Sequence, residues 1–283
     1  MANKAYLGAG LMFFTDKTGS VKYITNQANI TLNGILPISK LQRLSAGIQC
    51  GIAQHRWDVS LAKWEDQYNG STYDPTIQGE NIPSTNYTYG DFSAGVHWDY
   101  GKNQGYISSN DAFKIHTGIA LYHLNKPKQS LFLDPTEKLY SKICFHGGGE
   151  FGIKNTNIQL VPSFLYLHQG PSNELIIGSY IKYVLKEDSK YTGYVKGVAV
   201  SMGLYFRAKD AIVPSVLLEF GRCAFGISYD VNTSKLKTVS NGKVGLEIML
   251  KYRTPNPFFI RREPHQCFNG IYFHEQPFSY NTT

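Results

Sequence analysis

Strict alternation of apolar with small or polar side chains is the feature of this sequence that most limits its possible folds. The stretch CAFGISYDV, from Cys223 to Val231, places Cys, Phe, Ile, Tyr and Val on one phase and Ala, Gly, Ser and Asp on the other. Successive side chains of a β-strand point to opposite faces, so the stretch predicts a strand with a bulky apolar face and a small, polar face. A half-buried strand of a soluble protein instead presents long polar side chains opposite its apolar face.

The same alternation recurs from the first residues to about Tyr252. It predicts twelve strands, near 5–14, 20–37, 43–59, 91–100, 112–123, 141–153, 157–168, 173–185, 195–207, 211–220, 222–231 and 241–252. Several of these have ten residues or more, whereas strands in soluble proteins average about five or six. A tilted strand needs about 9–11 residues to cross a bilayer. We therefore predict an all-β fold: an antiparallel transmembrane β-barrel of meander topology at 1–253, then an irregular tail at 254–283.

Composition agrees with a strand-rich membrane protein. Charged residues make up 17% of the chain, below the usual value of about 25%, and aromatic residues make up 14%. The mean hydropathy of −0.27 does not exclude a barrel, because polar residues facing the lumen dilute the average. No apolar run reaches the length of about 18 residues that a transmembrane helix needs. The first ten residues lack the pattern of a signal peptide, so either the chain is cytoplasmic or its export signal is missing from this sequence.

The lengths of the predicted connections give a second test of the barrel. Outer-membrane barrels alternate short periplasmic turns with longer outer loops. The two longest connections, 60–90 and 124–140, fall on the same side when successive strands alternate in direction. Several connections of the other set are short, for example 38–42 and 154–156. The polar, turn-rich segment 60–90 is thus predicted to be an outer loop, either simply solvated or able to bind a partner.

Recognisable enzyme and nucleic-acid signatures are absent. The net charge of +7 comes from scattered Lys and Arg with no long basic run, which argues against nucleic-acid binding. The chain has no metalloprotease, nucleophile-elbow or phosphate-loop motif, and the glycines of FHGGGEFG (145–152) precede no Lys-Ser/Thr pair. His116 and His146 fall on the small, polar phase and are predicted to be structural. We predict no enzyme activity, no cofactor and no metal.

The four cysteines are widely spaced and form no C-x-x-C pair. They are Cys50, Cys144, Cys223 and Cys267. Cys50 and Cys223 lie on the apolar phase of their predicted strands. This pattern favours hydrophobic side chains over a zinc site, and it leaves disulfide formation open.

Five charged side chains share the inner phase of the last four predicted strands. They are Arg207, Glu219, Asp230, Glu247 and Lys251. Charges of both signs on a face shielded from water must pair or stay hydrated. We therefore predict a network of inner salt bridges that holds neighbouring strands together, or alternatively a surface that recognises a partner segment.

The order of several motifs resembles that of the PorP/SprF family of the type IX secretion system of Bacteroidota. The segments that carry the resemblance are RLSAGIQCGIAQHRWDVSLAKWEDQYNG (43–70), DFSAGVHWDY (91–100), TGIALYHLNKP (117–127), HGGGEFGI (146–153), LVPSFLYLHQGPSNELIIGSYIKYVL (160–185), FGISYDVNTSKL (225–236) and GLEIMLKYRTPNP (245–257). The resemblance covers nearly all of 5–257. The family barrel has about fourteen strands, against the twelve predicted here, and its signal peptide and early strand pair have no counterpart in this sequence.

The resemblance implies a location and a role. It implies a bacterial outer-membrane protein, in contact with the lipid bilayer and with periplasmic or outer-membrane secretion components. It implies a need for this protein in secreting adhesins or gliding proteins, or in anchoring them at the surface, through their C-terminal domains. The family has no transferable catalytic residues. A general porin or a hydrophobic-solute transport barrel is an alternative, and a soluble β-sandwich lectin is a third hypothesis.

Overall fold

A single antiparallel sheet accounts for nearly all of the regular structure. The computed structural model describes residues 5–80, 85–102, 113–129, 137–186, 197–233 and 245–253. The strands are β1 (Tyr6–Thr18), β2 (Tyr23–Pro37), β3 (Gln42–Arg56), β4 (Asn86–Lys102), β5 (Phe113–Tyr122), β6 (Lys142–Gly152), β7 (Ile158–Gln169), β8 (Ser172–Lys186), β9 (Val198–Arg207), β10 (Ala211–Phe220), β11 (Cys223–Tyr229), β12 (Val231–Asn232) and β13 (Leu246–Tyr252). Two short 3₁₀ helices, η1 (Val59–Leu61) and η2 (Glu65–Gln67), follow β3.

The strands pair in chain order. The sheet runs β1-β2-β3-β4-β5-β6-β7-β8-β9-β10-β11-β13, and the two-residue β12 pairs with β10. Every pairing is antiparallel, as expected when short connections join neighbours. The prediction of an all-β antiparallel meander is confirmed, and each of the twelve predicted strands has its counterpart. Within the described ranges, no helix is long and apolar enough to span a membrane.

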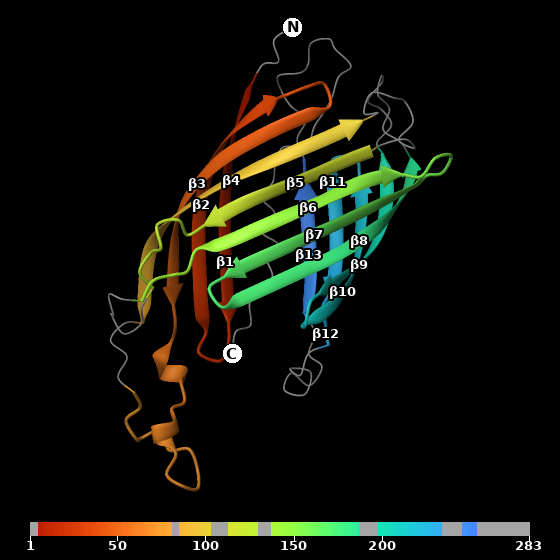
Figure 1. Cartoon of the computed structure of the whole chain (residues 1–283). Coiled ribbons are helices and arrows are strands. Elements are labelled where there is room, and N and C mark those ends of the chain that lie inside the picture. Colours follow the sequence, from red (N-terminus) through yellow and green to blue (C-terminus); the bar gives the residue numbers. More distant parts are fainter. Residues whose placement is uncertain are drawn as a thin grey trace.

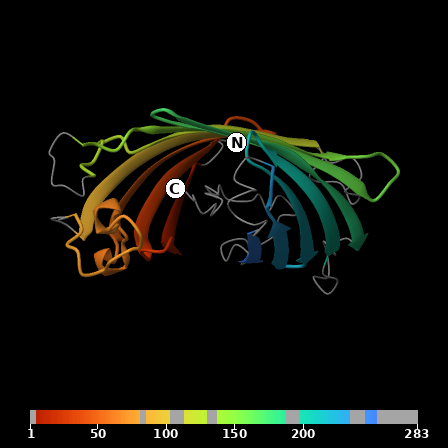
Figure 2. The same cartoon turned by 90° about the horizontal axis from the view of Figure 1, so that it is seen from below.

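The sheet curls into a barrel-like arc. Figure 2 shows the strands curving around a concave inner face, with β1 and β13 at the two edges of the arc. Among the described residues no pairing joins β1 to β13, so the sheet is open along this line. The predicted tail at 254–283 and Cys267 lie outside the described residues.

The two faces of the sheet differ as the alternation predicts. Outward side chains are large and exposed, with 71% of Leu11, 65% of Ile48 and 79% of Leu250 accessible. Inward side chains are small or polar and crowded by the curvature, and both Asn29 and Ser201 are 2% exposed. In a soluble sheet the apolar face would be the covered one. Here the apolar face is the exposed outer face and the polar face is the enclosed inner face, as in a transmembrane barrel.

Strand boundaries differ most around the predicted 60–90 loop. β3 ends at Arg56, and β4 begins at Asn86, five residues before the predicted start at 91. The segment NYTYG was predicted to be loop because of its polar turn residues. Its Tyr and Thr side chains suit a pleated surface, and Tyr87 pairs with His55 across the β3–β4 ladder. The connection is therefore shorter than predicted, and its base is a regular two-stranded ladder.

The long connections share one end of the sheet. The β3–β4 and β5–β6 connections both lie at the end where β1 stops at Thr18, whereas the turns β2–β3, β6–β7 and β10–β11 lie at the other end. The turn at Gly221 needs a φ of 55°, which glycine adopts without strain. We call the two ends the arm end and the short-turn end. The β3–β4 connection projects beyond the strands at the arm end (Figure 1).

Candidate functional site

The most prominent feature of the arm end is the ordered loop at 58–80, which we call the arm. It leaves the sheet after β3 and extends well past the ends of the strands (Figure 1). Two backbone hydrogen bonds hold its base: Trp57 N donates to Thr85 O at 3.1 Å, and Asp58 N donates to Val21 O at 2.9 Å. The base of the arm is therefore tied both to the start of β4 and to the β1–β2 turn.

Gln67 organises the interior of the arm. This side chain is 8% exposed, and its amide nitrogen donates to Ile77 O at 2.9 Å. Its side-chain oxygen accepts from Trp64 N at 3.1 Å, and its backbone oxygen accepts from Asp74 N at 2.8 Å. Buried amide groups need such partners, because an unsatisfied one costs about 1–3 kcal/mol. This one residue, through its side chain and its backbone oxygen, thus connects three parts of the arm, which has local order despite its polar, turn-rich sequence.

Two carboxylates cap turns at the surface of the arm. Asp58, the N-cap of η1, accepts from both the backbone N and the hydroxyl of Ser60. Asp74 accepts in the same way from Thr76, with the hydroxyl at 2.6 Å. In each case the hydroxyl hydrogen bond is the main cause that holds the pKa of the carboxyl below its usual value, because it stabilises the charged form.

The outer surface of the arm offers exposed aromatic and apolar side chains. Tyr68 is 57% exposed, and it pairs with Tyr73 in an isolated antiparallel bridge. Lys63 lies over the Tyr73 ring, with its Nζ 5.1 Å from the ring centroid. Exposed tyrosines beside a cation are typical of protein-binding surfaces, because they supply a large contact area at a low cost in side-chain entropy.

Below the arm, a tyrosine–histidine cluster lies on the inner face at the arm end of β2, β3 and β4. It consists of Tyr23, His55, Tyr87 and Tyr89. The His55 ring stacks on the rings of Tyr87 and Tyr89, with centroids 4.8 Å and 5.7 Å away. The hydroxyl of Tyr23 contacts His55 Nδ1 at 2.9 Å and the hydroxyl of Tyr87 at 2.8 Å. These polar tips satisfy one another, so the cluster is a rigid wall of the inner face directly below the arm.

Across the arc, Arg207 gathers three carboxylates on the inner face. Its Nη1 lies 3.0 Å from Asp210, its Nη2 lies 3.0 Å from Asp230, and its Nε lies 3.5 Å from Glu174. The planar guanidinium can bind several oxygens at once, which a lysine ammonium cannot match in geometry. The group joins β8, β9, the β9–β10 turn and the residue after β11. One guanidinium thus bridges three carboxylates from neighbouring elements.

The family comparison agrees with this architecture. A model of the family described as type IX secretion system membrane protein PorP/SprF matches residues 2–252. The chain belongs to the PorP/SprF family. No curated protein matches the chain. Because PorP/SprF proteins are membrane proteins, the exposed outward apolar face is the surface that contacts lipid.

In this PorP/SprF protein the five predicted inner charges fall into two groups. Arg207 and Asp230 form a direct pair at the arm end, and Glu247 lies on neighbouring β13, where Ser228 Oγ donates to it at 3.3 Å. Glu219 and Lys251 lie in one row nearer the short-turn end, each opposite Ala224. Glu219 forms a salt bridge with Lys182 of β8. Arg207 and Glu219 thus each form an ion pair between strands, at two different levels of the inner face.

Several side chains on the inner face of this PorP/SprF chain were not predicted from the sequence. Glu174 and Lys182 lie on the inner phase of β8, which the alternation of that strand would have indicated. A third histidine, His97, was also missed. Its ring centroid lies 5.3 Å from that of His146 and 5.9 Å from that of His116. Across the described part of the chain, no group of three His, Cys, Asp or Glu side chains is placed to hold a metal ion.

Proposed function

We propose that this chain is a non-catalytic outer-membrane barrel of the type IX secretion system. It is needed for secretion, or for surface anchoring, of adhesins or gliding proteins through their C-terminal domains. The arm end is the outer end in this proposal, since longer loops are typical of the extracellular side of outer-membrane barrels. The partner's C-terminal domain binds there, against the arm and the inner wall beneath it.

The ordered, projecting arm is the observation that carries the proposal. A loop that only connects two adjacent antiparallel strands needs about two to five residues. The arm has more than twenty residues and is locally ordered, with a buried glutamine inside and exposed tyrosines outside. Long ordered loops on a rigid sheet are where binding surfaces usually lie.

Replacing the arm tests the role directly. Since Trp57 and Thr85 are hydrogen-bonded neighbours, a four-residue Gly/Ser linker can replace 59–83 without opening the β3–β4 ladder. We expect this variant to fold, shown by heat-modifiable gel migration. We also expect it to lose binding of a type IX substrate's C-terminal domain in detergent, and to lose surface display of that substrate in cells.

A change at the short-turn end provides the matched control. Substituting the exposed turn residues Lys154 and Asn155 by Ser and Gly should leave binding and surface display unchanged. Normal binding and display by the arm-replaced variant would refute the proposal. A large, stable single-channel conductance of the wild-type protein would favour the general porin instead.

A further inference from the structure

A groove lies on the outer face of the sheet at the arm end, away from the inner wall. It has a volume of about 640 Å³, and its floor includes Ile143 of β6 and His168 of β7. These two residues are directly opposite each other in the ladder. Both point outward, because the adjacent pair Cys144 and Leu167 packs on the inner side. The groove therefore opens on the side of the sheet that faces lipid.

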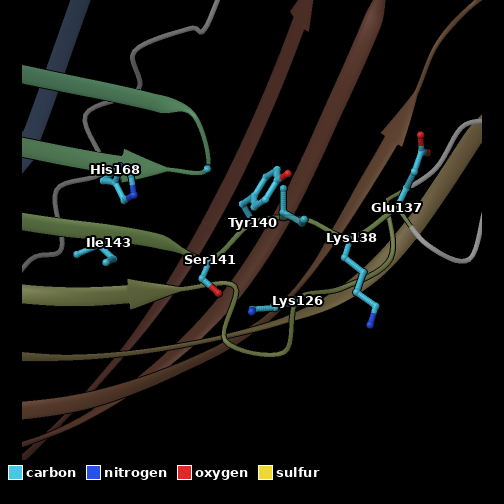
Figure 3. A pocket seen from close by; sticks show the side chains of 9 residues that line it. Lys126, Glu137, Lys138, Tyr140, Ser141, Ile143 and His168 are labelled. Carbon is cyan, nitrogen blue, oxygen red and sulfur yellow. The ribbon is translucent and has the colours of Figure 1, made fainter.

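The β5–β6 connection forms the other wall of the groove. Figure 3 shows Tyr140 and Ser141 in the middle, with Lys126 below them and Lys138 on the side away from β7. Tyr140 is 63% exposed, and its ring covers Gly170 of the β7–β8 turn, where an added Cβ would lie 2.7 Å from it. An exposed tyrosine above outward apolar side chains is the arrangement found where a barrel meets the polar surface of a bilayer.

Two lysines face each other at this wall. Lys128 and Lys138 face each other in an isolated antiparallel bridge. Two hydrogen bonds flank the bridge: Gln129 N donates to Glu137 O at 3.2 Å, and Leu139 N donates to Pro127 O at 2.9 Å. Lys128 and Lys138 are therefore a non-hydrogen-bonded pair, the type in which the facing side chains are closest. Like charges directly opposite each other destabilise a ladder, unless an anion lies between or beside them.

Lys126 and Lys138 line the groove, and Lys128 lies directly opposite Lys138 in the bridge. No carboxylate among the described residues forms an ion pair with Lys126, Lys128 or Lys138. Among the described residues that line the groove, Glu137 is the single acid, and its carboxylate points away from Lys126 in Figure 3. Basic side chains at the edge of an apolar membrane surface are complementary to phosphate-bearing lipid headgroups.

We propose that this groove binds an anionic lipid, with the headgroup phosphate on Lys126, Lys128 and Lys138 and the acyl chains along Ile143 and the neighbouring outward side chains. Tyr140 lies at the boundary between these two parts. The proposal depends on the membrane location that the family shows, and not on the partner-binding role of the arm. The proposal also explains why Lys128 and Lys138 face each other, because the lipid phosphate offsets the repulsion between their two ammonium groups.

Lipid retention by the full-length chain tests the proposal. The protein is purified in dodecyl maltoside micelles containing phosphatidylglycerol or phosphatidylcholine, and bound lipid is measured by native mass spectrometry. We expect tighter retention of phosphatidylglycerol. We expect the triple substitution of Lys126, Lys128 and Lys138 by Gln to weaken it by about fivefold per lysine, on the order of 100-fold in total.

A charge-matched control separates site binding from general attraction. Lys22, Lys40 and Lys154 lie exposed in other turns, and replacing all three by Gln removes the same net charge. We expect this control to retain the lipid as the wild type does. The proposal is overturned if both triple variants lose lipid equally, or if the two lipids bind alike. It is also overturned if inorganic phosphate at millimolar concentration displaces phosphatidylglycerol, because the site would then bind free phosphate.

Discussion

A reciprocal pair of glycine and tyrosine on β8 and β9 makes the most exact prediction about stability. Tyr180 lies opposite Gly203, and Tyr205 lies opposite Gly178, all on the inner face. The two rings meet edge to face with centroids 5.3 Å apart. A Cβ added at Gly203 would lie 2.5 Å from two carbons of the Tyr180 ring and 2.9 Å from Ser215 Oγ. Each glycine thus makes room for the ring of the facing tyrosine, a device that stabilises designed sheets.

Substituting Gly203 by Ala should therefore destabilise the protein through overpacking, by about 2 kcal/mol. Substituting Tyr180 by Ala removes a half-buried ring and its edge-to-face contact, which should lower the free energy of unfolding by about 2 kcal/mol. In the double variant the new methyl group meets no ring, and the remaining close atom, Ser215 Oγ, is the end of a side chain that can rotate away. We expect a total of about 2 kcal/mol rather than the additive 4 kcal/mol. The coupling free energy is then about −2 kcal/mol.

Equilibrium unfolding in guanidinium from lipid vesicles, followed by tryptophan emission, measures these differences. The Gly10→Ala variant is the control, because the atom nearest to its added Cβ is Thr31 Cβ at 4.0 Å, and it should change stability by less than about 0.5 kcal/mol. Free energies that add to within about 0.5 kcal/mol in the double variant would show that ring and glycine are not coupled, and would refute the reasoning.

Three further predictions concern other parts of the chain. The Arg207→Ala substitution leaves three inner carboxylates without their shared cation, and should lower the free energy of unfolding by about 2–4 kcal/mol, whereas Lys at this position should recover part of it. Because the folded arm lowers the pKa of Asp58 and Asp74, the stabilisation from their caps is present above the usual pKa of 3.8 and is lost as the pH falls through the lowered values. Hydrogen exchange of the amides they accept from should speed up there, and equal exchange rates at pH 7 and pH 2.5, after correction for intrinsic chemistry, would contradict this. Cys50 and Cys223 are free, exposed thiols on the outward face, and Cys144 is buried on the inner face. In vesicles an apolar maleimide should therefore label Cys50 and Cys223 but not Cys144, and a charged maleimide should not label Cys50 in the middle of β3.

Local pattern was sufficient to predict the strands and their faces. In β9, Met202, Leu204 and Phe206 are exposed and outward, as their alternation with Ser201 and Tyr205 predicts. The prediction succeeds because the pleat imposes a period of two on any strand, whatever its partners. It was less accurate for the boundaries of β4, where polar and aromatic residues that resemble a loop continue the ladder.

The candidate site was much less predictable. Arg207 and Asp230 were both predicted as inner charges, but Glu174 and Asp210, which complete the group, were not. The tyrosine–histidine cluster combines Tyr23, His55 and residues more than thirty positions further along the chain. Such meetings depend on the register of three strands and on side-chain direction, and neither quantity can be derived from the period of a single segment.

The sequence by itself therefore determined that the chain is an all-β membrane protein with an apolar exterior, because alternation and strand length are local properties that a bilayer constrains directly. Only the tertiary structure decided which inner charges pair, how the arm folds around Gln67, and that Lys126 and Lys138 line an outward groove. These features arise from contacts between segments distant in the chain. Their energies depend on distances of a few ångströms, and the curvature and register of the whole sheet set those distances.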